Sequence, residues 1–531
     1  MGLFIAQDSE FRVNTTNINL DVVTNPDVAV ADDGSFIVVW QEPFQGDGDS
    51  DIRFRRYSAN GDPLEGDFGA ETTNDDEFTP AIAIAPDGRF VITFVRDNSI
   101  FARIFDADGL PAGNSFLVST FQSDKRQSDP QIAIDGDGDF TIVWTHEFDT
   151  NDNDIRGRSY TIDGAELTGD IPIADSTSNE TEASIALIRE ANNNNSRDDL
   201  AGVITFTSDL NGNRDIFFAR YGNETNQLAD PLVAVSESNI EANQRESSVG
   251  INSSGAFTVS WTNEFSDVDD DVVLRRFSPE GNAVDVLEIP VDSATGDQNE
   301  SEIAVDDDGT IVVAYEDDVN NNVRYRQFTS FGEPLTNPET YDVNPDREAN
   351  PAIAIGGNNL VIAADDNRTS QFDALQPYAR VFDDSLISIN RFQNSQVPGT
   401  FLFAGAIESV NVRNNFPSFN EEGFAFNVFA EPDDNLIRIN RFQNQDVPGT
   451  FLFANEDESV NIRRDFPQFA EEGIAFYAYR SNAGIGEKYY RFQNSQIPGT
   501  FIFVDETERN NILSDPNLTQ FQLEGVAFEV A

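Results

Sequence analysis

Apolar and polar positions alternate along most of the chain, and the alternation recurs in blocks. In the first 385 residues each block holds an alternating apolar run, an Asp-Gly-type turn and a strongly apolar run closed by an aromatic residue. Alternation with a period of two predicts β-strands. The clearest copies are NPDVAVADDGSFIVVW (25–40), TPAIAIAPDGRFVITF (79–94), DPQIAIDGDGDFTIVW (129–144) and ESEIAVDDDGTIVVAY (300–315), and degenerate copies lie at 183–206, 247–261 and 350–364.

A second signature follows each apolar run: an arginine and then an aromatic residue, two positions later in most copies. Side chains two apart lie on the same face of a strand. The segments together form a four-stranded unit of about 50 residues, which is typical of a propeller blade, so seven copies predict a seven-bladed β-propeller. The arginines are expected to pair with acidic side chains of neighbouring blades, or alternatively to converge as a carboxylate-binding cluster. The copies are IRFRRY (52–57), IFARIF (100–105), IRGRSY (155–160), FFARYG (217–222), VVLRRF (272–277), VRYRQF (323–328) and PYARVF (377–382).

The two ends of this region predict how the ring closes. The seventh unit stops after its third strand at Phe382, while the chain opens with EFRVNTT (10–16), an outer-type strand without a partner. An open sheet edge invites aggregation, and closure removes it. We therefore expect residues 10–16 to complete the last blade of a propeller domain that spans residues 1–385.

From residue 386 a different unit recurs three times. Its copies begin RFQNSQVPGTFLFA (391–404), RFQNQDVPGTFLFA (441–454) and RFQNSQIPGTFIFV (491–504), and each continues into an acidic segment and an EG-x-AF run. Three copies of about 50 residues with several short strands predict a three-repeat, β-trefoil-like domain over 386–531, because a propeller needs at least four blades. The predicted fold class is all-β throughout.

The charge restricts the classes of partner. The 94 acidic and 33 basic residues give a formal net charge of −61, which repels nucleic acid and anionic membranes and attracts divalent cations. The chain has no cysteine and one histidine, His146, so thiolate and imidazole metal clusters are excluded. We expect His146 to be a loop residue without a catalytic role. The scarcity of lysine is similar to that of substrates of one-step bacterial export, or of salt-adapted proteins.

No stretch approaches 18 apolar residues, which predicts that the chain does not span a membrane. Residues 1–7 lack the basic region and the long apolar run of a Sec signal. We therefore expect an extracellular or cell-surface bacterial protein that is exported without a cleaved Sec signal.

Both repeats resemble known families. FRVNTT (11–16), NPDVAVADDGSFIVVW (25–40) and RYSANGDPLEGDF (56–68) resemble the propeller-type repeats of very large bacterial exoproteins and calcium-binding, adhesin-like proteins, which implies secretion. The C-terminal repeats are similar to the "YRFYN…HFYT…EGVAF" repeats of many secreted bacterial proteins. They depart from that pattern at TFLF, where the family has a His-Phe-Tyr-Thr run.

Acidic loops after the aromatic strands predict a possible Ca²⁺ cofactor. Ca²⁺ takes six to eight oxygen ligands, and alternating Asp and Asn in a Gly-containing loop supply them. The alternative is a set of solvated acidic turns without bound metal. The candidate ligands are Asp47, Asp49, Asp51, Asp149, Asn151, Asp154, Asp209, Asn211, Asp215, Asp267, Asp269 and Asp271.

The Asp-Gly turns at 33–34, 87–88, 137–138 and 308–309 are similar to the Asp-box of sialidases but lack its Thr and Trp. A type I′ hairpin accepts Asp-Gly because both central residues need positive φ. We therefore expect these turns to be structural.

The C-terminal repeats offer three equivalent pockets in which an amide and a guanidinium face an aromatic ring, as suits a sugar. Alternatively, the repeated aromatics build the core and the arginines tie each repeat together through Glu422 and its equivalents. The candidate ligand-binding residues are Arg391, Asn394, Arg441, Asn444, Arg491 and Asn494.

These observations predict a secreted or cell-surface, non-catalytic binding or structural protein. Its propeller is a rigid platform, and its C-terminal module attaches to an extracellular glycan or to a surface or matrix protein. One alternative is a propeller glycosidase or lyase with a carbohydrate-binding domain. Another is a structural subunit of an extracellular assembly. An axial pocket lined by paired acids and aromatic residues would favour the enzyme.

Overall fold

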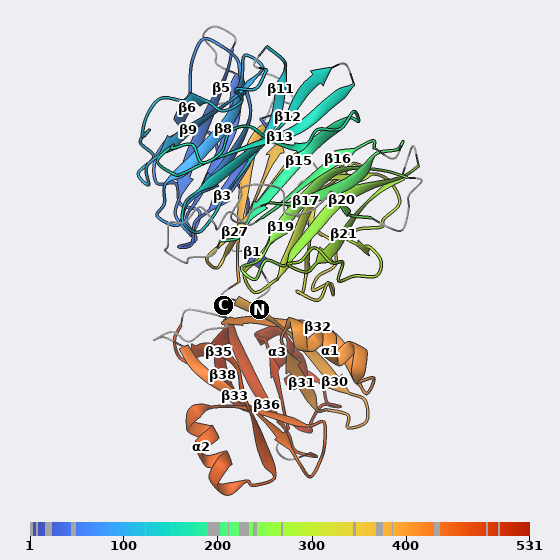
Figure 1. The fold of residues 1–531 in the computed structure, drawn as a ribbon. Coiled ribbons are helices and arrows are strands. Elements are labelled where there is room, and N and C mark those ends of the chain that lie inside the picture. The colour runs from blue at the N-terminus through green and yellow to red at the C-terminus, as the bar shows by residue number, and fades with distance from the viewer. Residues whose placement is uncertain are drawn as a thin grey trace. The chain divides into compact units, whose positions relative to one another are not determined.

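The computed structural model divides the chain into two compact units. Ala6–Phe382 form one unit, and Asp383–Ala531 together with Met1–Ile5 form the other. Figure 1 colours the first unit from blue to yellow and the second in orange and red. The residues that the structure describes are 4–6, 9–15, 24–43, 49–122, 124–149, 151–189, 202–210, 212–221, 233–236, 242–266, 269–342, 347–367, 375–384, 386–429, 436–484, 487–497 and 500–530.

The first unit is a seven-bladed β-propeller, as the repeats predict. It contains seven separate antiparallel sheets, six of them built from four consecutive strands. The first four sheets are β3 (Asp27–Val30), β4 (Phe36–Pro43), β5 (Ser50–Tyr57) and β6 (Phe68–Glu71); β7 (Glu77–Ile84), β8 (Phe90–Arg96), β9 (Ser99–Phe105) and β10 (Phe116–Leu117); β11 (Gln127–Ile134), β12 (Phe140–Asp149), β13 (Asp152–Tyr160) and β14 (Ile171–Ala174); β15 (Glu180–Leu187), β16 (Gly202–Ser208), β17 (Asp215–Tyr221) and β18 (Val233–Ala234).

The last sheet contains strands from both ends of the propeller sequence. The short strands β1 and β2 pair with β29, and Phe11 lies opposite Ala379. The innermost strand β27 contacts β3 of the first blade (Figure 1). The remaining strands are β19 (Asn243–Ile251), β20 (Phe257–Ser266), β21 (Asp269–Phe277) and β22 (Ile289–Pro290); β23 (Gln298–Val305), β24 (Ile311–Asp317), β25 (Asn322–Phe328) and β26 (Glu339–Thr340); β27 (Glu348–Gly356), β28 (Asn359–Asp366), β29 (Gln376–Asp383), β1 (Ile5–Ala6) and β2 (Phe11–Arg12).

Third-strand arginines join neighbouring blades by bonding to backbone carbonyls. Arg103 Nη1 donates to the Ala70 carbonyl of the preceding blade at 2.7 Å, and Arg275 Nη1 donates to the Val235 carbonyl at 2.7 Å. Arg55 makes the same bond to Val13, next to β2, at 2.9 Å. The segment that follows β2 therefore occupies the outer position of the seventh blade. The expected pairing with acidic side chains of neighbouring blades occurs at Arg324, which lies 2.7 Å from Asp292 of the preceding blade, and more loosely at Arg103, which lies 3.6 Å from Glu71.

Each blade carries one left-handed residue at an equivalent position, within the inner strand in blades two to seven and two residues before β3 in blade one. The φ angles of these non-glycine residues lie between 41° and 57°. In blades two to seven the pairing register of the inner strand shifts at this point, which identifies a β-bulge. Such a conformation is uncommon outside glycine and persists where the surrounding structure enforces it. The seven residues are Asn25, Thr79, Asp129, Glu182, Glu246, Glu300 and Asn350.

The Asp-Gly turns are structural, but they are not type I′. Gly34 and Gly88 have φ of 81° and 84°, whereas the aspartates before them, Asp33 and Asp87, are not in the positive-φ region. The Gly34 amide donates to the Ala31 carbonyl at 2.9 Å, and the Asp33 side chain accepts from a backbone amide within the turn. A longer hairpin turn with glycine in the left-handed position explains this pattern, because only the glycine needs positive φ.

The C-terminal unit does not show the predicted trefoil. Each repeat contains three strands and one helix, and the strands form one nine-stranded antiparallel sheet. In the second repeat the acidic segment after TFLF folds into a helix, because Asn455 caps the Glu458 amide and acidic side chains occupy the first turn. These residues are therefore helical and do not form a fourth strand. The elements are β30 (Leu386–Asn394), β31 (Phe401–Ala404), α1 (Ala406–Asn415) and β32 (Phe419–Phe429); β33 (Leu436–Asn444), β34 (Phe451–Asn455), α2 (Glu456–Asp465) and β35 (Phe469–Arg480); β36 (Glu487–Asn494), β37 (Phe501–Val504), α3 (Glu506–Ser514) and β38 (Phe521–Val530).

Two triangles of phenylalanine form the centre of this unit, one residue from each repeat. In the first, the ring of Phe403 lies 5.7 Å from that of Phe453 and 5.4 Å from that of Phe503. The second joins Phe426, Phe476 and Phe528, whose ring centroids lie 5.5 to 5.7 Å apart. All six side chains are buried. The repeats therefore meet around a pseudo-three-fold axis.

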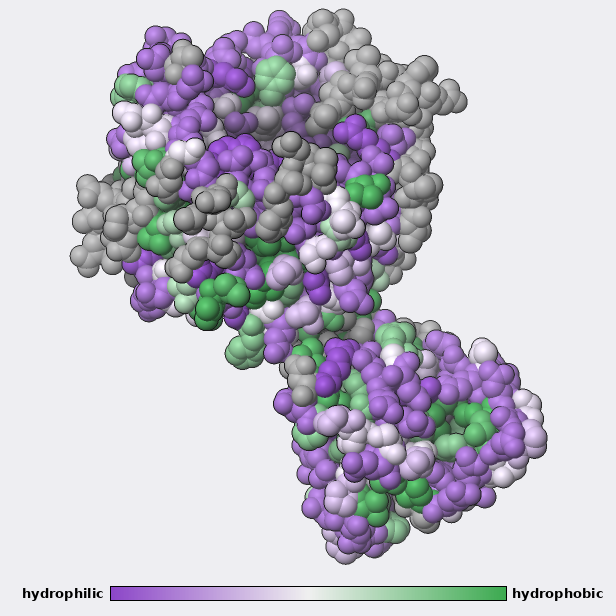
Figure 2. Space-filling view, turned by 90° about the vertical axis from the view of Figure 1, so that its right-hand side faces the viewer, coloured by the Kyte–Doolittle hydropathy of each residue, from purple (hydrophilic) through white to green (hydrophobic). Residues whose placement is uncertain are grey.

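The surface is hydrophilic in keeping with the charge. On the face shown in Figure 2, hydrophobic residues form small groups separated by hydrophilic ones. Within the described part of the chain, no helix has the length and hydrophobicity needed to cross a membrane.

Candidate functional site

A pocket of 340 Å³ opens on the propeller axis where the seven inner strands converge. Each blade contributes its left-handed residue to the wall, so the bulge directs these side chains toward the axis. Asp27 and Glu302 lie two positions further along their strands and line the pocket as well. The left-handed residues include four acids, which are Asp129, Glu182, Glu246 and Glu300.

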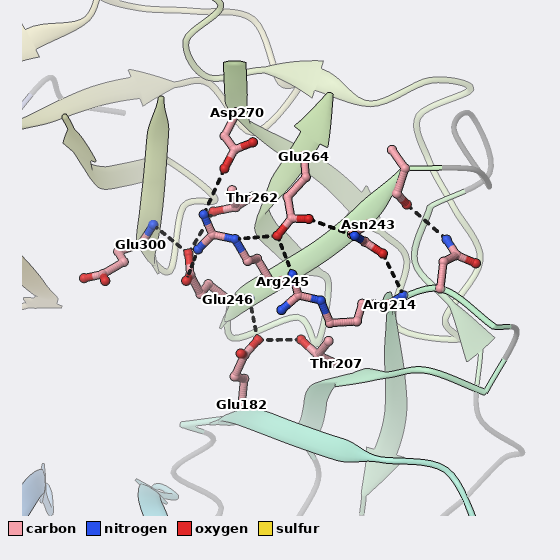
Figure 3. Close-up of polar contacts among 12 residues, drawn as sticks. Glu182, Thr207, Arg214, Asn243, Arg245, Glu246, Thr262, Glu264, Asp270 and Glu300 are labelled. Atoms are coloured by element: carbon pink, nitrogen blue, oxygen red, sulfur yellow. Dashed lines mark hydrogen bonds and ion pairs between the residues drawn. The ribbon is translucent and has the colours of Figure 1, made fainter. Parts of the chain in front are cut away.

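Hydrogen bonds link three of these acids into a chain along the rim (Figure 3). The Glu246 amide donates to Glu182 Oε2 at 2.8 Å, and the Glu300 amide donates to Glu246 Oε2 at 3.0 Å. Arg245 pairs with Glu246 and also donates to Glu264 at 2.9 Å. The carboxylates are therefore held in place by main-chain donors, and Glu246 also by Arg245, its neighbour on β19.

Burial changes the protonation of the axial acids. It raises the pKa of Glu302 to about 7, with a contribution from the charge of Asp27, and raises the pKa of Asp27 to about 6. Glu316 lies behind the rim beside Glu300, and burial together with the Glu300 charge raises its pKa to about 9. Glu316 therefore keeps a proton at neutral pH, and Glu300 hydrogen-bonds to it.

The described lining of the axial pocket contains no aromatic and no basic side chain. A sugar ring therefore finds no stacking platform in it, and an anionic substrate finds no counter-charge. The pocket instead presents oxygen atoms from carboxylates, amides and hydroxyl groups. This chemistry suits cationic or neutral polar ligands.

The predicted Ca²⁺ loops lie at the ends of the second and third strands of their blades. Asp47, Asn211 and Asp267 lie outside the described residues. Asp49, Asp51, Asp149 and Asn151 lie at or beside the β4–β5 and β12–β13 connections. Asp209 accepts from the Asn179 amide at 2.8 Å, Asp215 accepts from Asn213 at 3.1 Å and Asp269 accepts from the Gly296 amide at 3.0 Å.

Two residues of these loops have altered acidity. Burial and the neighbouring charge of Asp152 raise the pKa of Asp154 to about 6. Burial and Asp269 raise the pKa of Asp271 to about 6. Within the described residues, none of the predicted loops gathers three acidic ligands at one point.

One cluster of three acids does form, at a place that the loop pattern does not indicate. Asp342, Glu348 and Asp366 each place a carboxylate oxygen within 4.8 Å of the others, and all three side chains are buried. Asp342 follows the outer strand of blade six, while the other two residues begin β27 and end β28 of blade seven. The cluster therefore lies between two blades.

The predicted C-terminal arginines all make two ion pairs within their unit. Arg441 pairs with Glu472 of its own repeat and with Glu408 of the first repeat, both at 2.7 Å. Arg391 and Arg491 repeat the pattern, with Glu508 and Glu458 as the partners from another repeat. Their side chains are only 19–20% exposed. The geometry supports the fold-stabilising role of these arginines.

The predicted asparagines also connect repeats. Asn394 donates to the Gly449 carbonyl at 3.0 Å, and Asn494 donates to the Gly399 carbonyl at 3.2 Å. Asn444 is buried, and its side chain accepts from the Asp446 amide at 3.0 Å. The two inter-repeat bonds and the arginine pairs run in a closed cycle around the pseudo-three-fold axis.

A pocket of 590 Å³ lies in the second C-terminal repeat, away from these bonds. The half-buried ring of Tyr477 lines it, together with Asn455 and Asp457 at the start of α2. Arg438 also lines the pocket and pairs with Glu456 at 2.7 Å. The exposed Arg480, the last residue of β35, is a further lining residue. An aromatic ring, amides, carboxylates and guanidinium groups thus surround one cavity.

The repetition that marks the other predicted sites in the sequence does not mark this pocket. The pocket residues differ among the repeats: Tyr477 stands where the first repeat has Asn427 and the third has Glu529. Positions that repeat belong to the core and to the joints between repeats. A comparison of where the repeats differ is the signal that finds the pocket.

His146 does not lie in a loop. It is fully buried on β12, and its Nδ1 lies 2.9 Å from the Gln127 side-chain oxygen. Burial lowers its pKa, which favours the neutral ring, and the ring packs inside the blade.

Comparisons with known proteins follow the two units. A family model described as a domain of unknown function (DUF5648) matches residues 389–531. A comparison with curated proteins gives no match.

Solved structures with similarity to the chain include a PL25 ulvan lyase bound to -[GlcA(1-4)Rha3S]-. Its identity to this chain is 11% and the TM-score is 0.44, and the match covers 72% of this chain and 96% of the lyase. An α-L-arabinanase of Penicillium chrysogenum with arabinobiose has 12% identity, a TM-score of 0.40, and coverage of 72% and 98%. A Dyadobacter fermentans protein of unknown function has 10% identity, a TM-score of 0.42, and coverage of 72% and 99%. At these values the comparisons assign no activity to the chain.

Proposed function

We propose that this protein is an extracellular, non-catalytic glycan-binding protein, whose C-terminal unit holds the sugar and whose propeller is a rigid platform. The pocket beside Tyr477 carries the proposal. It combines an aromatic face with amide and charged groups, which is how proteins bind sugar rings.

The electrostatics of the C-terminal unit favour this location over the propeller. Residues 386–531 hold ten basic and twenty acidic residues, so this part has a far smaller net charge than the rest of the chain. Arg480 is exposed at the pocket, and no ion pair to it is found within the described residues. A guanidinium in that position binds a sugar hydroxyl or a uronate carboxylate. The pocket therefore accepts neutral or acidic glycans.

The test is a glycan array probed with the full chain and with Tyr477→Ala. We expect binding to at least one glycan class, and a loss of about tenfold or more in affinity for the variant, because stacking on the ring is removed. Asn427→Ala changes the equivalent position of the first repeat and should leave binding unchanged. If no glycan binds, or if Tyr477→Ala binds as the wild type does, the proposal is wrong.

A second candidate, a glycosidase or lyase acting at the axial pocket, has one observation in its favour. Burial and the neighbouring Glu300 raise the pKa of Glu316 to about 9, and a carboxyl group with a raised pKa beside a second carboxyl group is a feature of sites that cleave glycosides. The pocket lacks an aromatic platform, which weighs against this candidate. Release of reducing ends or unsaturated sugars from a polysaccharide panel, abolished in Glu300→Gln, would establish the enzyme.

A further inference from the structure

The junctions between successive blades can be compared position by position. Each junction brings together a residue at or just after the end of an outer strand, a residue at the start of the next inner strand and the residue facing it on the second strand. At five junctions this set is Glu71, Glu77 and Arg96; Ser119, Gln127 and His146; Ala174, Glu180 and Ser208; Ser236, Gln244 and Asn263; and Asp292, Gln298 and Asp317.

The junction between blades six and seven departs from the others. Its set is Asp342, Glu348 and Asp366, and Glu348 faces Asp366 across the β27–β28 ladder. Among the six junctions compared, it is the one with a carboxylate at all three positions. Three buried carboxylates at one point repel one another, and either a proton or a bound cation relieves that repulsion.

The preceding junction shows how the fold normally supplies that compensation. Arg324 Nη1 lies 2.7 Å from Asp292 Oδ2 and 3.5 Å from Asp317 Oδ2, and the inner-strand position is the neutral Gln298. In blade seven the residue equivalent to Arg324 is Tyr378. Compared with the preceding junction, this one therefore has a tyrosine in place of the arginine and a glutamate in place of the glutamine.

A second observation points to a ligand at this junction. Glu348 is 97% buried, and its Oε2 accepts from the Val323 amide at 2.9 Å. Its other oxygen, Oε1, is buried without any hydrogen-bond donor in the described structure. Since a buried carboxylate oxygen without a partner is costly, the geometry leaves one ligand position to be filled from outside the chain.

We propose that Asp342, Glu348 and Asp366 bind a single Ca²⁺ ion that fastens blade six to blade seven. Ca²⁺ takes the place that the guanidinium of Arg324 holds at the preceding junction. The site belongs to the propeller and is independent of the glycan pocket.

The donor set selects the cation. All ligands are carboxylate oxygens, which hard cations prefer, and soft metals gain nothing without nitrogen or sulfur. Ligands of one Ca²⁺, at 2.3–2.6 Å each, lie at most about 5 Å apart, which agrees with the spread of these oxygens. Mg²⁺ holds several waters and binds through one or two carboxylates, so a buried site with three suits it poorly.

The position explains why a metal would be useful here. Blade seven is the one blade that takes strands from both ends of the propeller sequence. A cation that joins it to blade six strengthens the ring beside the place where it closes. Calcium-free protein should therefore open at this blade first.

The test measures Ca²⁺ binding to chelator-treated full-length protein by calorimetry, and thermal unfolding with Ca²⁺, Mg²⁺ or NaCl at equal ionic strength. We expect Ca²⁺ to raise the propeller transition by about 3–6 °C at a hundredfold excess over Kd, with a smaller rise for Mg²⁺. Glu348→Gln and Asp366→Asn should each remove one Ca²⁺ from the stoichiometry and abolish that rise.

Two further variants separate this site from the acidic loops and from a folding defect. Glu348→Gln combined with Tyr378→Arg rebuilds the arrangement of the preceding junction, and it should fold stably in chelator and ignore Ca²⁺. Glu77→Gln changes a buried acid at the same position of blade two and should keep the full Ca²⁺ response. Unchanged stoichiometry in Glu348→Gln and Asp366→Asn, or a normal Ca²⁺ response in the double variant, would overturn the proposal.

Discussion

The propeller and the C-terminal unit each close a ring of repeats, but they join the repeats with different chemistry. In the propeller, an arginine donates to a backbone carbonyl of the preceding blade, as Arg55 does to Val13. In the C-terminal unit, an arginine pairs with a glutamate from another repeat, as Arg441 does with Glu408. A carbonyl is present whatever the side chain, whereas an ion pair requires two particular residues.

This difference explains the fidelity of the two sets of repeats. The blades diverge, and blade four has Ala219 where the other blades carry the joining arginine, because the sheet and its core tolerate the loss. The C-terminal copies keep RFQN and PGTF almost unchanged because each residue serves its own repeat and a neighbour. In both units, the candidate sites lie where one repeat departs from the rest, at Glu348 in the propeller and at Tyr477 in the C-terminal unit.

The largest effect should come from breaking the closure of the propeller. Deletion of residues 10–15 removes β2 and the Val13 carbonyl, which accepts from both Arg55 and the Tyr57 hydroxyl. Loss of the buried Val13 side chain and of the Phe11 packing should lower the free energy of unfolding by about 3–6 kcal/mol. Differential scanning calorimetry reports the propeller transition, and an unchanged midpoint would contradict closure by this strand.

An intermediate effect should separate the two kinds of joint. Arg441→Met leaves Glu408 and Glu472 without their shared partner and should cost about 1–3 kcal/mol in the C-terminal unit. Arg103→Met in the propeller removes hydrogen bonds to the Ala70 and Gly113 carbonyls and a 3.6 Å ion pair with Glu71, and should cost about 1 kcal/mol. Denaturant unfolding measures both. If Arg103→Met costs more than Arg441→Met, the comparison drawn here fails.

A smaller effect should depend on pH and be confined to the propeller. The pKa of Glu316 is raised to about 9, so between about pH 5 and pH 9 the unfolded chain is ionised there while the folded protein retains the proton. Stability therefore falls as pH rises through this range. Glu316→Gln should unfold with about 1–2 kcal/mol more stability than the wild type at pH 8 and with little difference at pH 5.

Glu264→Gln is the control with the opposite sign. Hydrogen bonds from Asn243 and ion pairs with Arg214 and Arg245 outweigh burial and hold the pKa of Glu264 below its usual range. Its stabilisation is present at neutral pH and is lost as pH falls, so this variant should be weakened at pH 8 and nearly neutral near pH 3. Parallel pH profiles for the two variants would mean that net charge, rather than these individual groups, governs the dependence.

The sequence by itself determined the number of repeats, the seven-bladed propeller and its strand order. These features follow from local alternation, turn chemistry and the recurrence of about 50 residues, all of which are written along the chain. It also showed that Arg391, Arg441 and Arg491 occupy equivalent positions. It did not reveal the helices of the C-terminal unit. An acidic segment such as 456–465 has the composition of a polar loop, and only the structure shows the cap at Asn455 and the packing of the buried Ile462.

Tertiary structure alone decided the sites. Asp342, Glu348 and Asp366 come from two consecutive blades and meet only when blade seven packs against blade six, so no motif in the sequence marks them. The axial acids gather because a bulge in the inner strands of blades two to seven turns one residue toward the axis, and a bulge is a property of strand pairing. Likewise, the second partner of each C-terminal arginine lies in another repeat. Which carboxylates come together, and which glutamate pairs with which arginine, is fixed by how the repeats pack around each ring.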